Sequence, residues 1–307
     1  GRGKEMEVRD LIQPYFVIEG KNKQENIKYF PGVKRLSIDN LINDILEIKN
    51  LGIRTVLLFG VSRRKDLFGS HAYSESGVVQ EAVRAIKRQI KDITVITDVC
   101  LCGYTTAGHC GILKARNKVV FDKEKTRKIL AKIALSHAQA GADLVAPSAM
   151  MALQVKAIRE ALDKNSFKGV GILAYSAKYA SSFYGPFREA LNSAPRFGGR
   201  SSYQLDYRNA AGALKKIEQD LKEGASIVMV KPALSYLDII YQAKQKFNVP
   251  LAAFNVSGEY SLAQTGAREG IFDKRQMVLE ILTSIKRAGA DLIITYHAKE
   301  VARWLAT

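Results

Sequence analysis

The sequence predicts an α/β fold of the closed (β/α)8, or TIM, barrel type, and three observations support this prediction. The length of 307 residues suits one barrel domain of this class. A unit repeats along the chain, in which a helical pattern ends in a glycine-containing turn and an apolar run follows. The apolar runs are continuous rather than alternating, which is typical of parallel strands buried on both faces.

Four glycine turns mark the repeat, and each places glycine where the end of a helix favours a left-handed residue: Gly52, Gly141, Gly224 and Gly289. Each turn leads into an apolar run. Four further runs complete a set of eight expected strands, at residues 15–18, 55–59, 94–97, 144–146, 170–173, 227–230, 251–254 and 292–294. Helical patterns lie between them, for example at Leu41, Ile45 and Ile48. A doubly wound open sheet is the alternative, although no Gly-x-Gly-x-x-Gly motif follows the first run.

Two stretches fall outside a minimal barrel. Residues 1–14 precede the first expected strand, and we expect them to form an N-terminal arm that grips a neighbouring subunit. Residues 15–307 then form a single catalytic barrel domain. Residues 176–209 follow the fifth strand and are rich in Ser, Tyr, Phe, Gly and Arg. A loop of this length in a compact domain is usually functional, so we expect an active-site lid.

The composition is basic, with 47 Lys and Arg against 30 Asp and Glu, a formal net charge of +17. These residues are spread over the whole length without a basic run, which favours a solvated surface over nucleic-acid binding. No apolar run reaches the length of about 18 residues that a membrane helix needs. The short charged N-terminus lacks the apolar stretch of a signal peptide, so we expect a soluble, cytoplasmic protein.

Two lysines follow expected strands at the barrel end where such enzymes place their active sites. Lys231 directly follows the sixth strand, and Lys178 follows the fifth. Burial there lowers the pKa of an amine, and two neighbouring ammonium groups lower each other's further. A free amine attacks a carbonyl to form a Schiff base. The alternative is that these lysines reach the rim and pair with carboxylates.

All three cysteines of the chain lie within eleven residues, at Cys100, Cys102 and Cys110. Three thiolates on one zinc leave its fourth position open, as catalytic zinc needs. Adjacent residues rarely reach the same metal, which disfavours His109 as a fourth ligand.

In the expected lid, Arg188 and Arg200 could bind carboxylates through two hydrogen bonds each. The alternatives are three unrelated cysteines and a solvated loop with incidental arginines.

Together these residues form motifs that resemble one family. The matching runs are Asp98 to Cys102, Gly108 to Gly111, Tyr175 to Lys178, Phe183 to Arg188, Met229 to Pro232, Val256 to Tyr260 and Ile293 to Tyr296. In this order, over nearly the whole chain, they are similar to the zinc-cysteine type of porphobilinogen synthase, also called 5-aminolevulinate dehydratase.

The resemblance implies a reaction and a set of roles. Two molecules of 5-aminolevulinate condense with loss of two waters to give porphobilinogen, a precursor of heme and other tetrapyrroles. Lys178 and Lys231 each form a Schiff base with one substrate. The further implied residues are Arg188, Arg200 and Gln204 for the first carboxylate, Ser257 and Tyr296 for the second, Cys100, Cys102 and Cys110 for Zn²⁺, and Asp98 beside the metal. The family also implies a homo-octamer assembled through N-terminal arms.

The sequence departs from the family pattern close to the site. The family usually has acidic residues at the places of Ala149, Ala152, Gly199 and Leu67. A member with lost or redirected activity is therefore an alternative, as is another Schiff-base barrel enzyme such as a class I aldolase. Some members hold an allosteric Mg²⁺ through a glutamate at the place of Lys216, so we do not expect that ion here.

Overall fold

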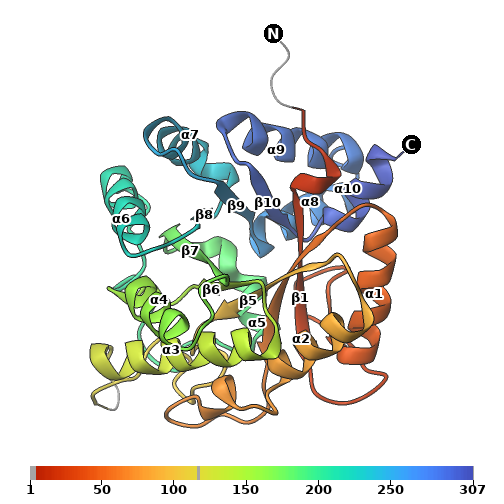
Figure 1. Cartoon of the computed structure of the whole chain (residues 1–307). Helices are drawn as coiled ribbons and strands as arrows, with labels where there is room; N and C mark the ends of the chain where they lie inside the picture. The colour runs from red at the N-terminus through yellow and green to blue at the C-terminus, as the bar shows by residue number, and fades with distance from the viewer. Residues whose placement is uncertain (1–4, 116–117, 307) are drawn as a thin grey trace.

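The computed structural model describes residues 5–115 and 118–306 as a closed barrel of parallel strands, which confirms the predicted fold (Figure 1). The strands pair in sequence order, and β10 closes the ring by pairing with β1. The eight barrel strands are β1 (Leu11–Ile18), β4 (Thr55–Val61), β5 (Thr94–Val99), β6 (Leu144–Pro147), β7 (Gly171–Lys178), β8 (Ile227–Lys231), β9 (Leu251–Asn255) and β10 (Leu292–Thr295).

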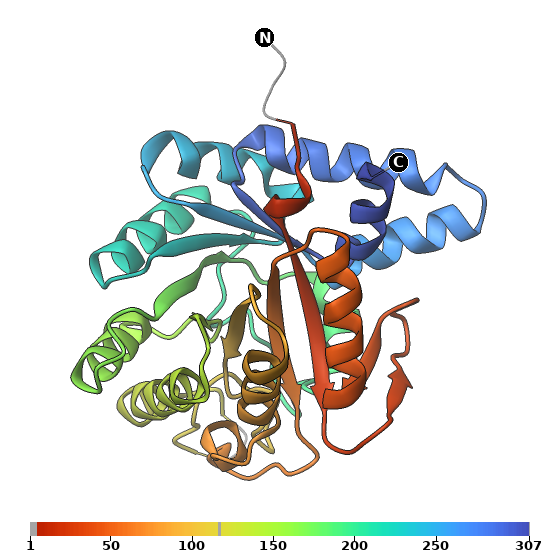
Figure 2. The same cartoon turned by 45° about the vertical axis from the view of Figure 1, so that its right-hand side comes forward.

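Helices cover the outside of the barrel (Figures 1 and 2). They are α1 (Ile38–Asn50), α2 (Val78–Gln89), α3 (Lys123–Ala140), α4 (Gln154–Lys164), α6 (Ala210–Lys222), α7 (Leu237–Lys246), α9 (Lys274–Ala288) and α10 (Ala298–Leu305). The predicted glycine turns end four of them. Gly141 and Gly289, for example, adopt φ angles of 109° and 127°, which an L-residue with a side chain rarely reaches. In the part of the chain described, no helix is long and apolar enough to cross a membrane.

Additional elements decorate the barrel. A small hairpin, β2 (Gln24–Asn26) and β3 (Lys34–Ser37), follows β1, and β3 pairs with β1. Two further helices, α5 (Gly185–Ala190) and α8 (Ser257–Arg268), stand at the carboxyl ends of the strands. Short 3-10 turns complete the set: η1 (Val8–Asp10), η2 (Ser70–Tyr73), η3 (Ser182–Tyr184) and η4 (Leu234–Tyr236). The elements η3 and α5 lie in the predicted lid.

Two apolar layers hold the fold together. One lies between strands and helices, and the other combines the barrel interior with the packing of α3 and α4 on the strands. In the interior, Phe16 stacks on Phe59 and on Tyr296, with ring centroids 5.6 and 5.9 Å apart. Burying one such side chain contributes about 1.5–3 kcal/mol. The polar groups that follow the strands are therefore held by a rigid, water-free wall.

The first strand begins at Leu11, four residues before the prediction. Residues 11–14 belong to the barrel wall, so the expected arm over residues 1–14 is too long. Residues 1–4 of that arm lie outside the described residues. Gln13 interrupts the apolar pattern, but its amide is used: its Oε1 accepts from the Lys299 backbone N–H at 3.2 Å.

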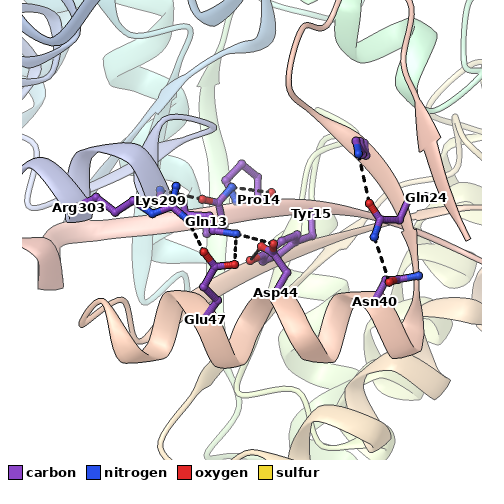
Figure 3. Close-up of polar contacts among 10 residues, drawn as sticks. Gln13, Pro14, Tyr15, Gln24, Asn40, Asp44, Glu47, Lys299 and Arg303 are labelled. Atoms are coloured by element: carbon purple, nitrogen blue, oxygen red, sulfur yellow. Dashed lines mark hydrogen bonds and ion pairs between the residues drawn. The ribbon is translucent and has the colours of Figure 1, made fainter. Parts of the chain in front are cut away.

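A polar cluster fastens α10 and α1 to this strand (Figure 3). The Lys299 ammonium pairs with Asp44 and Glu47 at 2.7 and 2.5 Å, and Asp44 also accepts from the Tyr15 hydroxyl at 2.5 Å. Arg303 pairs with Glu47 as well. The first and last thirds of the chain are thereby joined at the seam where the barrel closes.

Candidate active site

The two predicted lysines lie side by side at the carboxyl end of the barrel. Lys178 and Lys231 are register partners on β7 and β8, and both side chains are buried. The Lys178 Nζ donates to the Ser148 carbonyl at 2.6 Å, at the end of β6. Both Nζ atoms face the ring of Tyr175, at 5.6 Å from Lys178 and 5.2 Å from Lys231.

Lys231 is enclosed by aromatic rings. Its Nζ lies 4.3 Å from the ring centroid of Phe254 and 4.6 Å from that of Phe187. Burial lowers the pKa of Lys231 well below its usual value, and repulsion from Lys178 lowers it further. The nearby carboxyl of Asp98 acts in the opposite direction without reversing the shift. Burial and the neighbouring ammonium therefore both favour the free-amine form of Lys231.

Asp98, at the end of β5, interacts electrostatically with Lys178, Lys231 and Cys102. Desolvation raises its pKa to about 6, although a hydrogen bond with Ser148 and the charges of Lys178 and Lys231 oppose the rise. A carboxyl group with this pKa exchanges a proton readily near neutrality. Its predicted place beside the metal site stays a prediction.

The three cysteines converge as predicted. The ligand atoms of Cys100, Cys102 and Cys110 all lie within 4.8 Å of one another, and all three residues are buried. The Sγ atoms of Cys100 and Cys102 are 3.6 Å apart. The thiols of Cys100 and Cys102 lower the pKa of Cys110 well below its usual value. Three buried thiols in this arrangement fit a soft divalent metal.

His109 points away from this cluster. Its Nε2 lies 2.9 Å from the carbonyl oxygen of Phe197, and its Nδ1 lies 3.3 Å from the hydroxyl of Tyr203. The imidazole therefore links the cysteine loop to the lid.

The predicted carboxylate-binding residues carry polar atoms without a partner. These buried atoms are Nε of Arg188, Nε of Arg200, both amide atoms of Gln204 and the hydroxyl of Tyr296. Buried polar groups are normally hydrogen-bonded, so an unpaired set marks a place prepared for a ligand. Arg188 and Arg200 repel each other enough to lower the pKa of Arg188, although burial is the larger cause. Such a pair favours an anion.

Arg200 also joins the lid to the cysteine loop, because its Nη2 donates to the carbonyls of Ser193 and Gly108 at 2.6 and 3.1 Å. Burial alone lowers the pKa of Arg200, but the thiols of Cys102 and Cys110 and the Tyr203 hydroxyl raise it above its usual value. The guanidinium therefore stays charged.

Ser257 is tied to the lid rather than free. Its hydroxyl donates to the Phe183 carbonyl at 3.0 Å and accepts from the Phe187 N–H at 3.1 Å. Its predicted role in carboxylate binding stays a prediction.

Sequence reasoning did not anticipate the contacts of two tyrosines of this site, of which Tyr184 was expected only to help exclude water. Tyr175 was counted only as part of a motif, yet its buried hydroxyl has no partner and its ring faces both lysines. Tyr184 holds the end of β8, since its hydroxyl donates to the carbonyls of Tyr179 and Lys231 at 2.7 and 3.2 Å. An aromatic residue three positions before Lys178 was the available signal for Tyr175, but the partners of Tyr184 depend on the fold.

The departures from the family pattern are accommodated locally. Ala149 is fully buried beside Ser148. The Gln154 side chain braces its own loop, accepting from the Met151 N–H at 3.2 Å and donating to the Pro147 carbonyl at 3.4 Å. Leu67 is 62% exposed. Lys216, at the place where some family members have a glutamate, pairs with the buried Asp220. The absence of an allosteric Mg²⁺ stays a prediction.

Comparison with known proteins identifies the family of the chain. The family model described as "Delta-aminolevulinic acid dehydratase" matches residues 2–304. The chain belongs to the delta-aminolevulinic acid dehydratase family. The predicted family and enzyme class are thereby confirmed.

Individual relatives span almost the whole chain. Delta-aminolevulinic acid dehydratase of Synechocystis sp. is 49% identical over 99% of this chain and 93% of its own length. The Methanothermus sociabilis enzyme is 53% identical over 95% and 90%. A crystal structure of the Toxoplasma gondii enzyme in complex with its reaction product porphobilinogen has a TM-score of 0.94 and 39% identity, covering 98% of this chain and 86% of that chain.

Proposed function

We propose that this delta-aminolevulinic acid dehydratase condenses two molecules of 5-aminolevulinate to porphobilinogen, with loss of two waters, for tetrapyrrole and heme synthesis. The observation that carries the proposal is the pair of buried lysines, Lys178 and Lys231, paired in register within one aromatic enclosure. Each amine attacks the ketone of one substrate and forms a Schiff base. The iminium acts as an electron sink, so that the adjacent carbon loses a proton and forms the new carbon–carbon bond.

The polar atoms around the lysines suit the two substrate carboxylates. Arg188, Arg200 and Gln204 offer the unpaired donors for the first. The unpaired hydroxyl of Tyr296 serves the second, and Ser257 is the further residue that we assign to it. Fixing both anions holds the reacting carbons in register, which removes much of the entropic cost of a bimolecular step.

Zn²⁺ is the metal that we assign to Cys100, Cys102 and Cys110, because three thiolates fit it and leave one position open. When bound there, zinc acts as a Lewis acid toward water or a substrate heteroatom. Asp98 interacts electrostatically with both lysines and with Cys102, and it exchanges a proton with the substrate on Lys231. Phe187 and Phe254 exclude water from that amine.

The remaining assignments are the cytoplasm and a homo-octamer. The three cysteines are free, which suits a reducing compartment. The octamer is assigned from the family resemblance. The described residues before Leu11 would then be the part of the subunit-contacting arm that leaves the barrel.

The test is to incubate the purified chain with 5-aminolevulinate, first with zinc and then with a chelator, and to measure porphobilinogen with an aldehyde colour reagent. Zinc-dependent product supports the reaction and the metal site together. Product that survives chelation keeps the reaction and removes the cysteines from it. Folded protein without product favours a member with lost or redirected activity, and Ala149→Asp and Ala152→Asp are then the first changes to test.

A further inference from the structure

Glu259 is a buried carboxylate outside the set of catalytic and binding residues derived above. It lies in the first turn of α8, two residues after Ser257, and is only 4% exposed. Among the ion pairs of the described residues, none involves Glu259. A buried carboxylate without an ion-pair partner is costly unless hydrogen bonds compensate for it.

The compensation comes from three backbone N–H groups on two loops. Val256, the residue before α8, donates to Glu259 Oε2 at 2.6 Å. Leu234 donates to Oε1 at 2.5 Å, and Ala233 donates to Oε2 at 3.4 Å. The Val256 bond resembles the glutamate half of a helix capping box. The other two reach across to the loop that follows β8.

These contacts connect the two elements that carry the second-substrate site. Ala233 and Leu234 come directly after the Lys231–Pro232 dipeptide at the end of β8. Val256 directly precedes Ser257, whose hydroxyl binds the lid at Phe183 and Phe187. One carboxylate therefore sets the separation between the Lys231 loop and the start of α8.

The rest of the site fixes Lys231 only loosely in direction. Its Nζ is surrounded by rings, which exclude water but aim the amine weakly compared with a hydrogen bond. Lys178, in contrast, donates directly to Ser148. The direction of the Lys231 amine thus depends on the backbone from which it extends, and Glu259 binds that backbone two and three residues further along, at Ala233 and Leu234.

We propose that Glu259 is a positioning residue for Lys231, and that it holds the β8 loop so that this amine meets the ketone of the second substrate. The proposal rests on the function assigned above. It predicts a selective effect, because Lys178 is oriented through β6 and has no contact with Glu259.

The experiment traps the Schiff bases of the full-length zinc-loaded protein. The protein is incubated with 5-aminolevulinate, reduced with borohydride and digested, and the modified fraction at each lysine is measured by mass spectrometry. Glu259→Gln keeps the shape but replaces one acceptor oxygen by an amide donor that faces a backbone N–H. We expect at least a tenfold fall in trapping at Lys231 and unchanged trapping at Lys178. We also expect kcat to change by a larger factor than KM.

Asp143→Asn is the matched control. Asp143 is also a carboxylate that accepts from a backbone N–H, that of Val95 at 2.7 Å, but it lies at the opposite end of the barrel, before β6. It is expected to lower stability and leave the trapping ratio unchanged. Should Glu259→Gln not fold, Glu259→Asp carries the comparison, since a side chain shorter by one methylene reaches only one of the two loops.

The outcomes separate the two proposals. Wild-type protein that traps substrate at neither lysine overturns the assigned function. In the other case, wild-type protein traps substrate at both lysines. If a Glu259→Gln or Glu259→Asp variant then keeps the wild-type ratio of trapping at Lys231 to trapping at Lys178 and only melts at a lower temperature, Glu259 has a purely structural role and the inference is overturned.

Discussion

Lys178 and Lys231 are register partners at the ends of the adjacent parallel strands β7 and β8, so two amines of like charge share one enclosure. They differ in their surroundings. Lys178 donates to a backbone carbonyl, whereas the Lys231 ammonium is surrounded by aromatic rings. This asymmetry gives the two subsites different surroundings on one sheet edge, and burial, which lowers the pKa of Lys231, favours its free-amine form.

Replacing Lys231 should separate the two subsites. Lys231→Met retains an apolar chain of similar length but no amine, so we expect turnover to fall by about three orders of magnitude or more. Lys178 should still form a reducible Schiff base with 5-aminolevulinate. Borohydride trapping with peptide mapping checks this, and a variant with near wild-type turnover would contradict the two-lysine assignment.

Much of this arrangement follows from sequence. Continuous apolar runs with glycine turns predict the barrel, because strands that are buried on both faces occur mainly in parallel sheets covered by helices. Residues that directly follow the strands, such as Lys231 and Asp98, are then placed at one end by topology. The start of β1 was missed because the use of Gln13 depends on Lys299, which lies 286 residues away. Glu259 and Tyr184 likewise act through partners that only the fold brings near.

The aromatic enclosure should set the pH dependence of the reaction. Phe187→Ala removes the lid ring that lies 4.6 Å from the Lys231 Nζ and admits water. Because burial is the largest cause of the lowered pKa of Lys231, hydration should raise that pKa. The ammonium form then persists to higher pH, so the acidic limb of the kcat/KM profile should move to higher pH.

Phe183→Ala is the control for this shift. Phe183 lies in the same lid, but its ring is not among those described around the Lys231 Nζ. A Phe187→Ala profile that falls uniformly, without movement of its acidic limb, would mean that the ring acts in packing alone.

Arg35 should stabilise the closed conformation of the lid. From β3 it donates to the carbonyls of Ala190 and Glu189, both at 2.7 Å, at the end of α5, where a cation also meets the negative end of the helix. Hydrogen bonds to a charged group contribute about 1.5–3 kcal/mol. If they favour the closed lid, Arg35→Gln should raise KM by about tenfold with little change in kcat, because fewer molecules are competent to bind.

Arg63→Gln is the matched control for Arg35→Gln. Arg63 and Arg35 pair with the same carboxylate, Glu25, at 3.2 and 3.6 Å, but Arg63 is 73% exposed and has no described contact with the lid. Steady-state kinetics of both variants decide the matter. Equal KM values for the two variants would assign the Arg35 contacts to hairpin stability instead.

His137 should make the fold sensitive to acid. It is buried where α3 packs on β5, with its Nδ1 2.9 Å from the Thr97 hydroxyl, and burial lowers its pKa to about 3. In the unfolded chain the pKa is about 6.5, so the unfolded state binds the proton first as the pH falls. The native state therefore keeps its full stability above about pH 6.5 and loses it progressively toward pH 3.

Between pH 7 and pH 5 this single group should remove about 2 kcal/mol from the free energy of unfolding, since each pKa unit is worth about 1.4 kcal/mol. His137→Gln should abolish that part of the loss, whatever it does to stability at pH 7. Urea unfolding at both pH values measures the difference, and His71→Gln, a change on the partly exposed η2, should leave it intact. If wild type and His137→Gln lost the same unfolding free energy between pH 7 and pH 5, the result would contradict this prediction. It would show that the imidazole does not resist protonation in the native state, because a buried neutral ring is the only reason to expect a difference between the two proteins.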